Sequence, residues 1–267
     1  MIRRQVQATL MTTWNMSIPL IHALSPARMV AQLLIRELGN TLSQYTFIDF
    51  CAGAGGPTPS IEREINGHLR SQNEEPVDFV LTDINPNVAS WEKFASKNPR
   101  ITYESEPVDA SKAPPHLVKR GDGKKVMRLF NLAFHHFDDP LATDILRDTV
   151  QTGQGFAIFE LQDRSFASFI ATTLLPFGAM LAAPFYALKW RSPATFIFTW
   201  IIPILPPVLV FDGYVSSLRT REPEEVEALL RGCGADTSNW EMKSGSVAHL
   251  WPIGYINWII CKPIDKD

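Results

Sequence analysis

The sequence lacks the cysteine and histidine spacing of disulfide-bonded and metal-binding proteins and the positive charge of nucleic-acid-binding proteins. Its three cysteines, Cys51, Cys233 and Cys261, are odd in number and widely spaced, which argues against a disulfide framework and against a zinc cluster. Apart from one adjacent pair, the histidines show no ligand spacing, so we expect no bound metal. A net charge of −3 over 267 residues gives no electrostatic case for nucleic acid as a partner. A reducing compartment fits these absences best.

The N-terminal residues lack the uninterrupted apolar core of a signal peptide. Gln5, Gln7 and Asn15 interrupt it, although a basic pair precedes it at Arg3 and Arg4. We therefore expect no secretion signal. The expected location is cytoplasmic, with the protein peripheral or anchored at an intracellular membrane.

Strand-like and helix-like segments alternate along most of the chain. A first helix is predicted over 25–39, where Ser25 can cap, Pro26 suits the first turn and Gly39 can end the helix. Further helices are predicted over 59–71, 87–97, 138–151 (capped by Asp139) and 222–234, and strands over 45–50, 77–83, 100–107, 126–134, 155–161, 239–244 and 255–263. This alternation predicts an α/β fold with a mainly parallel sheet and helices on both of its faces.

The segment FIDFCAGAGG, residues 47–56, runs from a strand directly into small residues. Gly53, Gly55 and Gly56 allow unusual backbone angles and a close approach to a ligand. Asp83 ends the second strand, where a carboxylate can accept hydrogen bonds from the hydroxyls of a ribose. The two features in this order predict a ligand that contains a nucleoside. The alternative is a sheet turn without a ligand, in which Asp83 caps the next helix.

The first of these motifs resembles that of class I S-adenosylmethionine-dependent methyltransferases. Their acid-x-Gly-x-Gly-x-Gly pattern is matched from Asp49 to Gly55, except that Cys51 stands where the family usually has its first glycine. The segments SEPVDAS and NLAFHHFDDP also resemble segments of the family. The resemblance covers about residues 25–164 and 220–263 of this chain. The resemblance implies a Rossmann-like seven-stranded sheet. It implies S-adenosylmethionine as cofactor, held by Asp49, Cys51, Ala52, Gly53, Gly55, Asp83, Ile84, Val108, Asp109 and Ala110.

A dinucleotide-binding oxidoreductase is the main competing interpretation. Such enzymes prefer Gly-x-Gly-x-x-Gly, whose last glycine would here fall on Thr58, and they need room for a pyrophosphate at the helix N-terminus. Asp49, inside the first strand, suits a methyltransferase that uses it indirectly to hold the methionine amino group. The methyl donor is therefore favoured.

Three residues near the ends of the fourth and fifth strands are candidates for the chemistry. His135 or His136 could deprotonate a weakly acidic substrate group, and Glu160 could bind or deprotonate one. The alternatives are that a histidine stacks near the cofactor or caps the turn at Asp138 and Asp139, and that Glu160 pairs with Arg164.

Residues 165–188 and 192–211 contain no charged side chain. Their lengths suit a membrane-spanning hairpin, but six prolines argue against one: Pro176, Pro184, Pro193, Pro203, Pro206 and Pro207. Adjacent prolines break a helix and leave carbonyls without partners, a cost that hydrocarbon cannot relieve. We expect a hydrophobic helical insertion after the fifth strand that acts as a lid and dips into a membrane surface, with Trp190, Trp200, Lys189 and Arg191 at the boundary between lipid and water. A core extension or oligomer interface remains an alternative.

The expected organisation is one methyltransferase-like domain over residues 1–267, with an N-terminal helical cap at 1–44 and the insertion at 165–215. The expected function is methyl transfer from S-adenosylmethionine to a lipophilic small molecule, such as a natural-product intermediate, a prenylated compound or a lipid. One alternative is a protein that binds the cofactor and catalyses a cyclisation or rearrangement without methyl transfer. Another is a membrane-anchored protein without catalysis.

Overall fold

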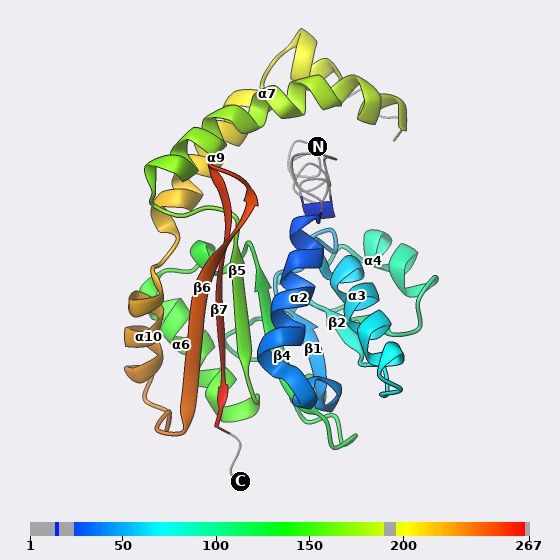
Figure 1. Ribbon diagram of the computed structural model, residues 1–267, viewed down its shortest axis with the longest axis vertical. Helices are drawn as coiled ribbons and strands as arrows, with labels where there is room; N and C mark the ends of the chain where they lie inside the picture. Colours follow the sequence, from blue (N-terminus) through cyan, green and yellow to red (C-terminus); the bar gives the residue numbers. More distant parts are fainter. Residues whose placement is uncertain (1–13, 16–23, 190–195, 265–267) are drawn as a thin grey trace.

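The computed structural model describes residues 14–15, 24–189 and 196–264 (Figure 1). The expectations that concern a signal segment at residues 1–13 and the side chains of Trp190, Arg191 and Pro193 lie outside this part of the chain.

A seven-stranded sheet forms the centre of the molecule, in the order β3-β2-β1-β4-β5-β7-β6. The strands are β1 (Tyr45–Asp49), β2 (Phe79–Leu81), β3 (Ile101–Tyr103), β4 (Lys125–Asn131), β5 (Phe156–Glu160), β6 (Trp240–Leu250) and β7 (Gly254–Pro263). The first five strands are parallel, and β7 runs antiparallel to both β5 and β6. The strand order reverses between β1 and β4, so the carboxyl ends of these two strands flank the usual ligand crevice of an open sheet.

Helices cover both faces of the sheet because alternate side chains of its strands enter two separate cores. Phe47 belongs to the core that α2 and α3 cover, whereas Ile48 belongs to the core that α6 and α10 cover. The helical elements are α2 (Pro26–Leu38), η1 (Gly39–Gln44), α3 (Thr58–Ser71), α4 (Val88–Ala95), α5 (Pro115–Val118), η2 (Phe134–His136), α6 (Asp139–Thr152), α7 (Phe166–Lys189), η3 (Ile197–Ile201), α9 (Leu205–Arg219) and α10 (Pro223–Arg231). The predicted α/β fold with a seven-stranded sheet is confirmed.

The start of α6 differs from the prediction. Asp138, not Asp139, is the capping residue, and its carboxylate accepts a hydrogen bond from the backbone N–H of Leu141 at 3.0 Å. Asp139 is the first helical residue and pairs with Arg221 at 2.7 Å instead. With Asp138 as the cap, Pro140 is the second helical residue and has no N–H, so the Asp138 carboxylate accepts from the next N–H, that of Leu141.

The charge-free region lies between β5 and α10, where α7 and α9 pack against each other as a hairpin. The hairpin rises from the end of β5 and arches over that edge of the sheet (Figure 1). Pro176 and Pro184 lie within α7 without ending it. Pro206 and Pro207 occupy the first turn of α9, where a missing N–H costs no hydrogen bond. Among the described residues, no helix has the combined length and apolarity needed to cross a bilayer.

Candidate functional site

The end of β1 carries a buried carboxylate. Asp49 is 1% exposed; one of its oxygens accepts from the Thr58 hydroxyl, and the other accepts from the Asn131 amide nitrogen at 3.2 Å. The amide oxygen of Asn131 is buried and has no partner among the described residues. The Asp49 carboxylate and the Asn131 amide are thus held together at the carboxyl ends of β1 and β4.

The turn after β1 has left-handed backbone at several positions. Cys51, where the methyltransferase motif usually has glycine, adopts a φ of 63°, and Leu132 after β4 adopts 52°. Such angles are strained for residues with a side chain and are often found at binding sites. Gly55 has a φ of 104°, and a Cβ added there would lie 2.7 Å from the ring of Phe94. The glycine therefore serves the packing of α4 against the turn, whereas Gly56 has no contact nearer than 4.0 Å.

Asp83 lies beside this turn and fixes its shape. Its carboxylate accepts from the backbone N–H groups of Gly53 at 2.9 Å and Asn85 at 2.8 Å. The side chain is 7% exposed. The alternative that Asp83 caps the next helix is wrong, because α4 begins at Val88 with Asn87 at the capping position.

The loop after β3 joins the same region. The backbone N–H of Val108 donates to the carbonyl of Asp83 at 3.0 Å. The carboxylate of Asp109 accepts from the backbone and hydroxyl of Ser111 at 2.8 and 2.7 Å. The carbonyl of Ala110 accepts from the buried guanidinium of Arg128 at 3.0 Å. The residues expected to hold the cofactor therefore converge from three strand ends, and Ile84, at 53% exposure, lies at their outer edge.

The charge around the turn is negative. Burial raises the pKa of Asp49 to about 7, with the nearby charge of Asp83 adding to the effect and hydrogen bonds from Thr58 and Asn131 opposing it. Burial, followed by the charges of Asp83, Asp49 and Asp109, raises the pKa of the Cys51 thiol to about 12. Within the described part of the chain, neither Asp49 nor Asp83 forms an ion pair. A ligand that brings positive charge would complement this field, and one that brings phosphates would be repelled.

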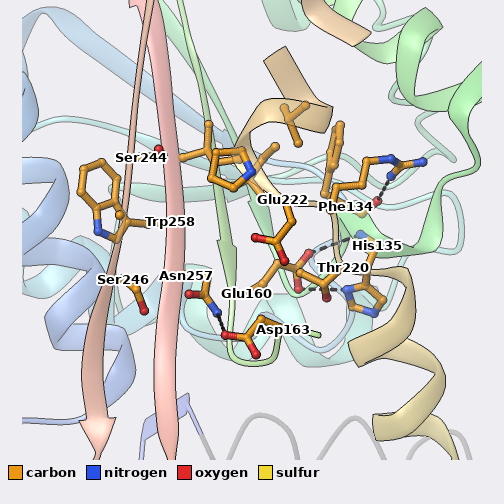
Figure 2. A pocket seen from close by; sticks show the side chains of 16 residues that line it. Phe134, His135, Glu160, Asp163, Thr220, Glu222, Ser244, Ser246, Asn257 and Trp258 are labelled. Carbon is orange, nitrogen blue, oxygen red and sulfur yellow. Dashed lines mark hydrogen bonds and ion pairs between the residues drawn. The ribbon is translucent and has the colours of Figure 1, made fainter. Parts of the chain in front are cut away.

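A histidine and a glutamate form a second cluster (Figure 2). His135, in η2, places its Nδ1 2.9 Å from one carboxylate oxygen of Glu160, at the end of β5. The second oxygen of Glu160 accepts from the backbone N–H of His135 at 3.3 Å. Gln162 also donates to Glu160, at 3.1 Å. The expectation that Glu160 pairs with Arg164 is wrong, because Arg164 pairs with Glu225 at 2.9 Å.

The pKa values of the two adjacent histidines are shifted in opposite directions. Burial alone would lower the pKa of His135, but the charge and hydrogen bond of Glu160, together with the charge of Asp212, raise it above its usual value. Desolvation and the neighbouring His135 lower the pKa of His136, whose ring centroid lies 4.1 Å from that of His135. Because Nδ1 of His135 faces Glu160, its Nε2 is the ring nitrogen left for exchange of a proton with a substrate.

A cavity of about 260 Å³ adjoins this pair. Glu160, Asp163, Thr220, Glu222 and Asn257 are among the polar residues that line it, from β5, β7 and the start of α10 (Figure 2). Asn257 donates to Asp163 at 3.1 Å, which fixes that wall. The three candidate catalytic residues therefore lie together: His135 and Glu160 line the cavity, and His136 lies against His135.

Sequence reasoning missed several residues that build the site. Arg128 could have been found from the sequence, because it is a charged residue inside an otherwise apolar strand. Its side chain is fully buried and pairs with Asp148 at 2.5 Å. Nothing in the sequence pointed to Asn131, because asparagine is common at the end of a strand. Asn15 reaches the glycine turn from far along the chain and donates to the carbonyl of Gly56 at 3.5 Å.

Comparisons with known proteins concern the fold. A scan against protein-family models and a search of curated proteins both return no match. Among solved structures, the chain is similar to an S-adenosylmethionine-dependent methyltransferase from Anabaena variabilis, at 16% identity, with 99% of this chain and 96% of that chain covered and a TM-score of 0.49. It is also similar to human N-acetylserotonin methyltransferase in complex with SAM, at 13% identity, 90% and 56% coverage and a TM-score of 0.46.

A third similar structure is the pyocyanin biosynthetic protein PhzM, at 14% identity, 88% and 55% coverage and a TM-score of 0.49. The chain spans little more than half the length of the human protein and of PhzM. With TM-scores below 0.5, none of these similarities supports an inference about function, which depends on the residues of the site.

Proposed function

We propose that this protein is an enzyme that transfers a methyl group from S-adenosylmethionine to a lipophilic small molecule. The observation that carries the proposal is the pair of buried carboxylates, Asp49 and Asp83, at the carboxyl ends of neighbouring strands on either side of the glycine turn. S-adenosylmethionine brings a sulfonium and an ammonium, and these charges match an acidic site whose carboxylates form no ion pair within the described residues.

The same charges argue against a dinucleotide. A pyrophosphate would lie at the N-terminus of α3, where the Thr58 hydroxyl already donates to the carboxylate of Asp49. Three carboxylates act on the neighbouring Cys51 thiol. Because phosphates carry negative charge, their binding beside these groups would cost free energy that a cationic donor would gain.

The described residues fit the donor at defined places. Asp49 and the unpaired amide oxygen of Asn131 would accept hydrogen bonds from the amino group. Asp83 would accept from the ribose hydroxyls, and the loop of Val108, Asp109 and Ala110 would flank the adenine. When bound, the donor supplies an electrophilic methyl group. The protein's own contribution is to align the acceptor with that group and to exclude water.

The His135 and Glu160 pair would serve an acceptor that has to lose a proton. Glu160 holds Nδ1 of the imidazole and raises its pKa, which makes Nε2 a stronger base toward a hydroxyl or another weak acid. His136, with its lowered pKa, stays neutral near pH 7 and would contribute shape and polarity at the rim.

The hairpin of α7 and α9 supports a lipophilic acceptor and contact with a membrane surface. Phe177, Leu181 and Phe211 are 61%, 79% and 72% exposed, and Trp200 and Ile201 near η3 are 46% and 64% exposed. Several exposed apolar side chains on one hairpin favour contact with apolar matter. Because residues 165–188 and 192–211 offer no charge, the surface would suit lipid or a lipid-like substrate better than a charged partner.

Calorimetric titration with S-adenosylmethionine tests the cofactor. Asp83→Asn should weaken binding roughly tenfold or more, because it removes charge-assisted hydrogen bonds to the ribose. Asp78→Asn is the matched control: this aspartate lies just before β2, at the opposite end of the strand, and pairs with Arg100. Equal affinities for wild type and Asp83→Asn would overturn the assignment of Asp83.

A second experiment tests the hairpin. Wild-type protein should sediment with phosphatidylcholine vesicles, whereas a variant with Phe177, Leu181 and Phe211 replaced by serine should stay in solution. Ile264→Ser is the control, since Ile264 is 56% exposed but directly follows β7. The chain leaves β7 at the end of the sheet opposite the hairpin (Figure 1). Transfer of labelled methyl to a panel of lipophilic acceptors should fall in the triple variant while affinity for the donor is unchanged. Vesicle binding that is equal in wild type and triple variant would contradict the role of this surface.

A further inference from the structure

The hairpin is joined to the turn that carries the two histidines by an arginine fork. Arg219, the last residue of α9, donates from Nε to the carbonyl of His135 at 2.8 Å and from Nη2 to the carbonyl of His136 at 2.9 Å. A guanidinium that binds two successive carbonyls restricts the rotation of the peptide between them. The fork therefore fixes the backbone from which the His135 ring projects.

The turn has little rigidity of its own, since η2 is three residues long. Arg221 holds its two flanking carbonyls, at Phe134 (3.4 Å) and Phe137 (2.8 Å), and pairs with Asp139 outside it. The central carbonyls depend on Arg219. Loss of Arg219 would thus free the centre of the turn while its ends stay attached.

Charged groups from three elements face His135. Glu160 contacts it from β5, and His136 lies beside it in η2. Asp212 and Arg219 act on it from α9, where the carboxylate favours and the guanidinium disfavours the protonated imidazole. The hairpin thus contributes both a mechanical contact and two charges to the histidine.

We propose that Arg219 is a positioning residue that holds the His135 imidazole against Glu160 and so couples the hairpin to the candidate catalytic pair. Movement of α9 against an apolar substrate or a lipid surface would shift the carbonyls that Arg219 binds, and with them the contact of 2.9 Å between His135 and Glu160. The importance of this coupling for turnover rests on the proposed function, but the coupling itself can be measured without any substrate.

The test is the pKa of His135, followed by NMR in the full-length protein. Its resonances are assigned among the six histidines by comparison with His135→Gln. The variants are Arg219→Gln and Arg219→Lys, the latter keeping the charge and losing the fork. Arg164→Gln is the matched control: Arg164 also lies at the base of the hairpin, but it donates to the carbonyl of Leu218 and pairs with Glu225, away from the histidines.

The direction of the shift separates a positioning role from a purely electrostatic one. If Arg219 holds His135 against Glu160, Arg219→Lys lowers the pKa of His135 by about one unit, because the favourable contact with Glu160 is loosened while the positive charge is kept. In Arg219→Gln the loss of the guanidinium charge offsets part of that fall. If Arg219 acts only through its charge, Arg219→Gln raises the pKa and Arg219→Lys leaves it unchanged. Arg164→Gln should leave it unchanged in either case.

A rise in the pKa of His135, or no shift, in Arg219→Lys overturns the proposal. Failure of both variants to fold would also overturn it, because Arg219 would then be a structural residue. In a methyl-transfer assay the expected result is a roughly tenfold loss of kcat with little change in KM, as for misplacement of a reacting group. A protein that transfers no methyl group would refute the proposed function and leave the NMR result standing, so the two failures are distinguishable.

Discussion

Replacement of Asp49 by asparagine tests the electrostatic basis of the site. The change keeps the shape of the side chain and removes the buried charge. One amide oxygen can still accept a hydrogen bond from Asn131 or Thr58, while the new NH2 group donates to the Thr58 hydroxyl or to the Asn131 amide oxygen. In the folded protein the pKa of Asp49 is raised from 3.8 to about 7. Since each unit corresponds to about 1.4 kcal/mol, the ionised form costs on the order of 4 kcal/mol of folding free energy.

The direction in which stability changes with pH follows from proton linkage. Between the unfolded value of 3.8 and the folded value of about 7, the folded protein holds a proton that the unfolded chain has lost. Its stability therefore falls as the pH rises through this window and is constant above it. Relative to Asp49→Asn, the wild type should lose roughly 2 to 3 kcal/mol of unfolding free energy between about pH 5 and pH 8.5.

Urea unfolding of the ligand-free proteins at both pH values measures this difference. Asp144→Asn is the control, because Asp144 is an exposed aspartate that pairs with Arg147 on the surface of α6. Its stability should run parallel to that of the wild type. Parallel curves for Asp49→Asn as well would refute the claim that burial raises the pKa of Asp49.

Binding of a cationic donor should reverse the protonation of Asp49. At pH 7 the carboxyl is about half protonated, so a ligand that favours its ionised form should release about half a proton. Calorimetry in buffers of different ionisation enthalpy counts this release, which Asp49→Asn should abolish. Affinity should rise with pH up to the region of the folded pKa and change little above it. Uptake of protons on binding would contradict the assignment.

Two further changes test the turn and the histidine pair. Gly55→Ala should destabilise the protein by about 2 kcal/mol or more, because the new Cβ meets the ring of Phe94. Gly56→Ala meets no such contact and should cost about 1 kcal/mol. Equal unfolding free energies for the two variants would contradict the packing role of Gly55. Glu160→Gln should lower the pKa of His135, since it removes the charge that raises it. The limb of the pH–kcat profile that reports a neutral base should then move to lower pH, and an unmoved limb would separate Glu160 from the action of His135.

The fold was accessible from the sequence because its signals are local. A run of apolar residues at 45–50, a glycine-rich turn and an acid at the end of the next strand each report on their own neighbourhood. The ends of elements were less certain, as the cap of α6 shows, because two adjacent aspartates compete for one position and only geometry chooses between them. The helix α7 shows a second reason. It continues through Pro176 and Pro184, although proline is unfavourable inside a helix when only the local sequence is considered, and it packs against α9.

The candidate site was only partly accessible, because its pairings join residues far apart in the chain. Glu160 and Arg164 are near neighbours in sequence, and their spacing favoured a pair that the structure does not form. The true partner of Glu160 is 25 residues away, and the fork from Arg219 crosses 84 residues. No pattern within one segment reports such contacts, since they depend on how β4, β5 and α9 are brought together.

The separation of charge in the molecule adds a physical reason for a methyl-transfer cycle. Carboxylates gather at the turn after β1, whereas the hairpin beyond β5 is free of charge over most of its length. A field set by Asp49, Asp83 and Asp109 favours a sulfonium over the neutral thioether that remains once the methyl group has left. The proposed donor would therefore be held more tightly than its product at the acidic turn, and the loss of charge during transfer would itself favour exchange of product for a new donor.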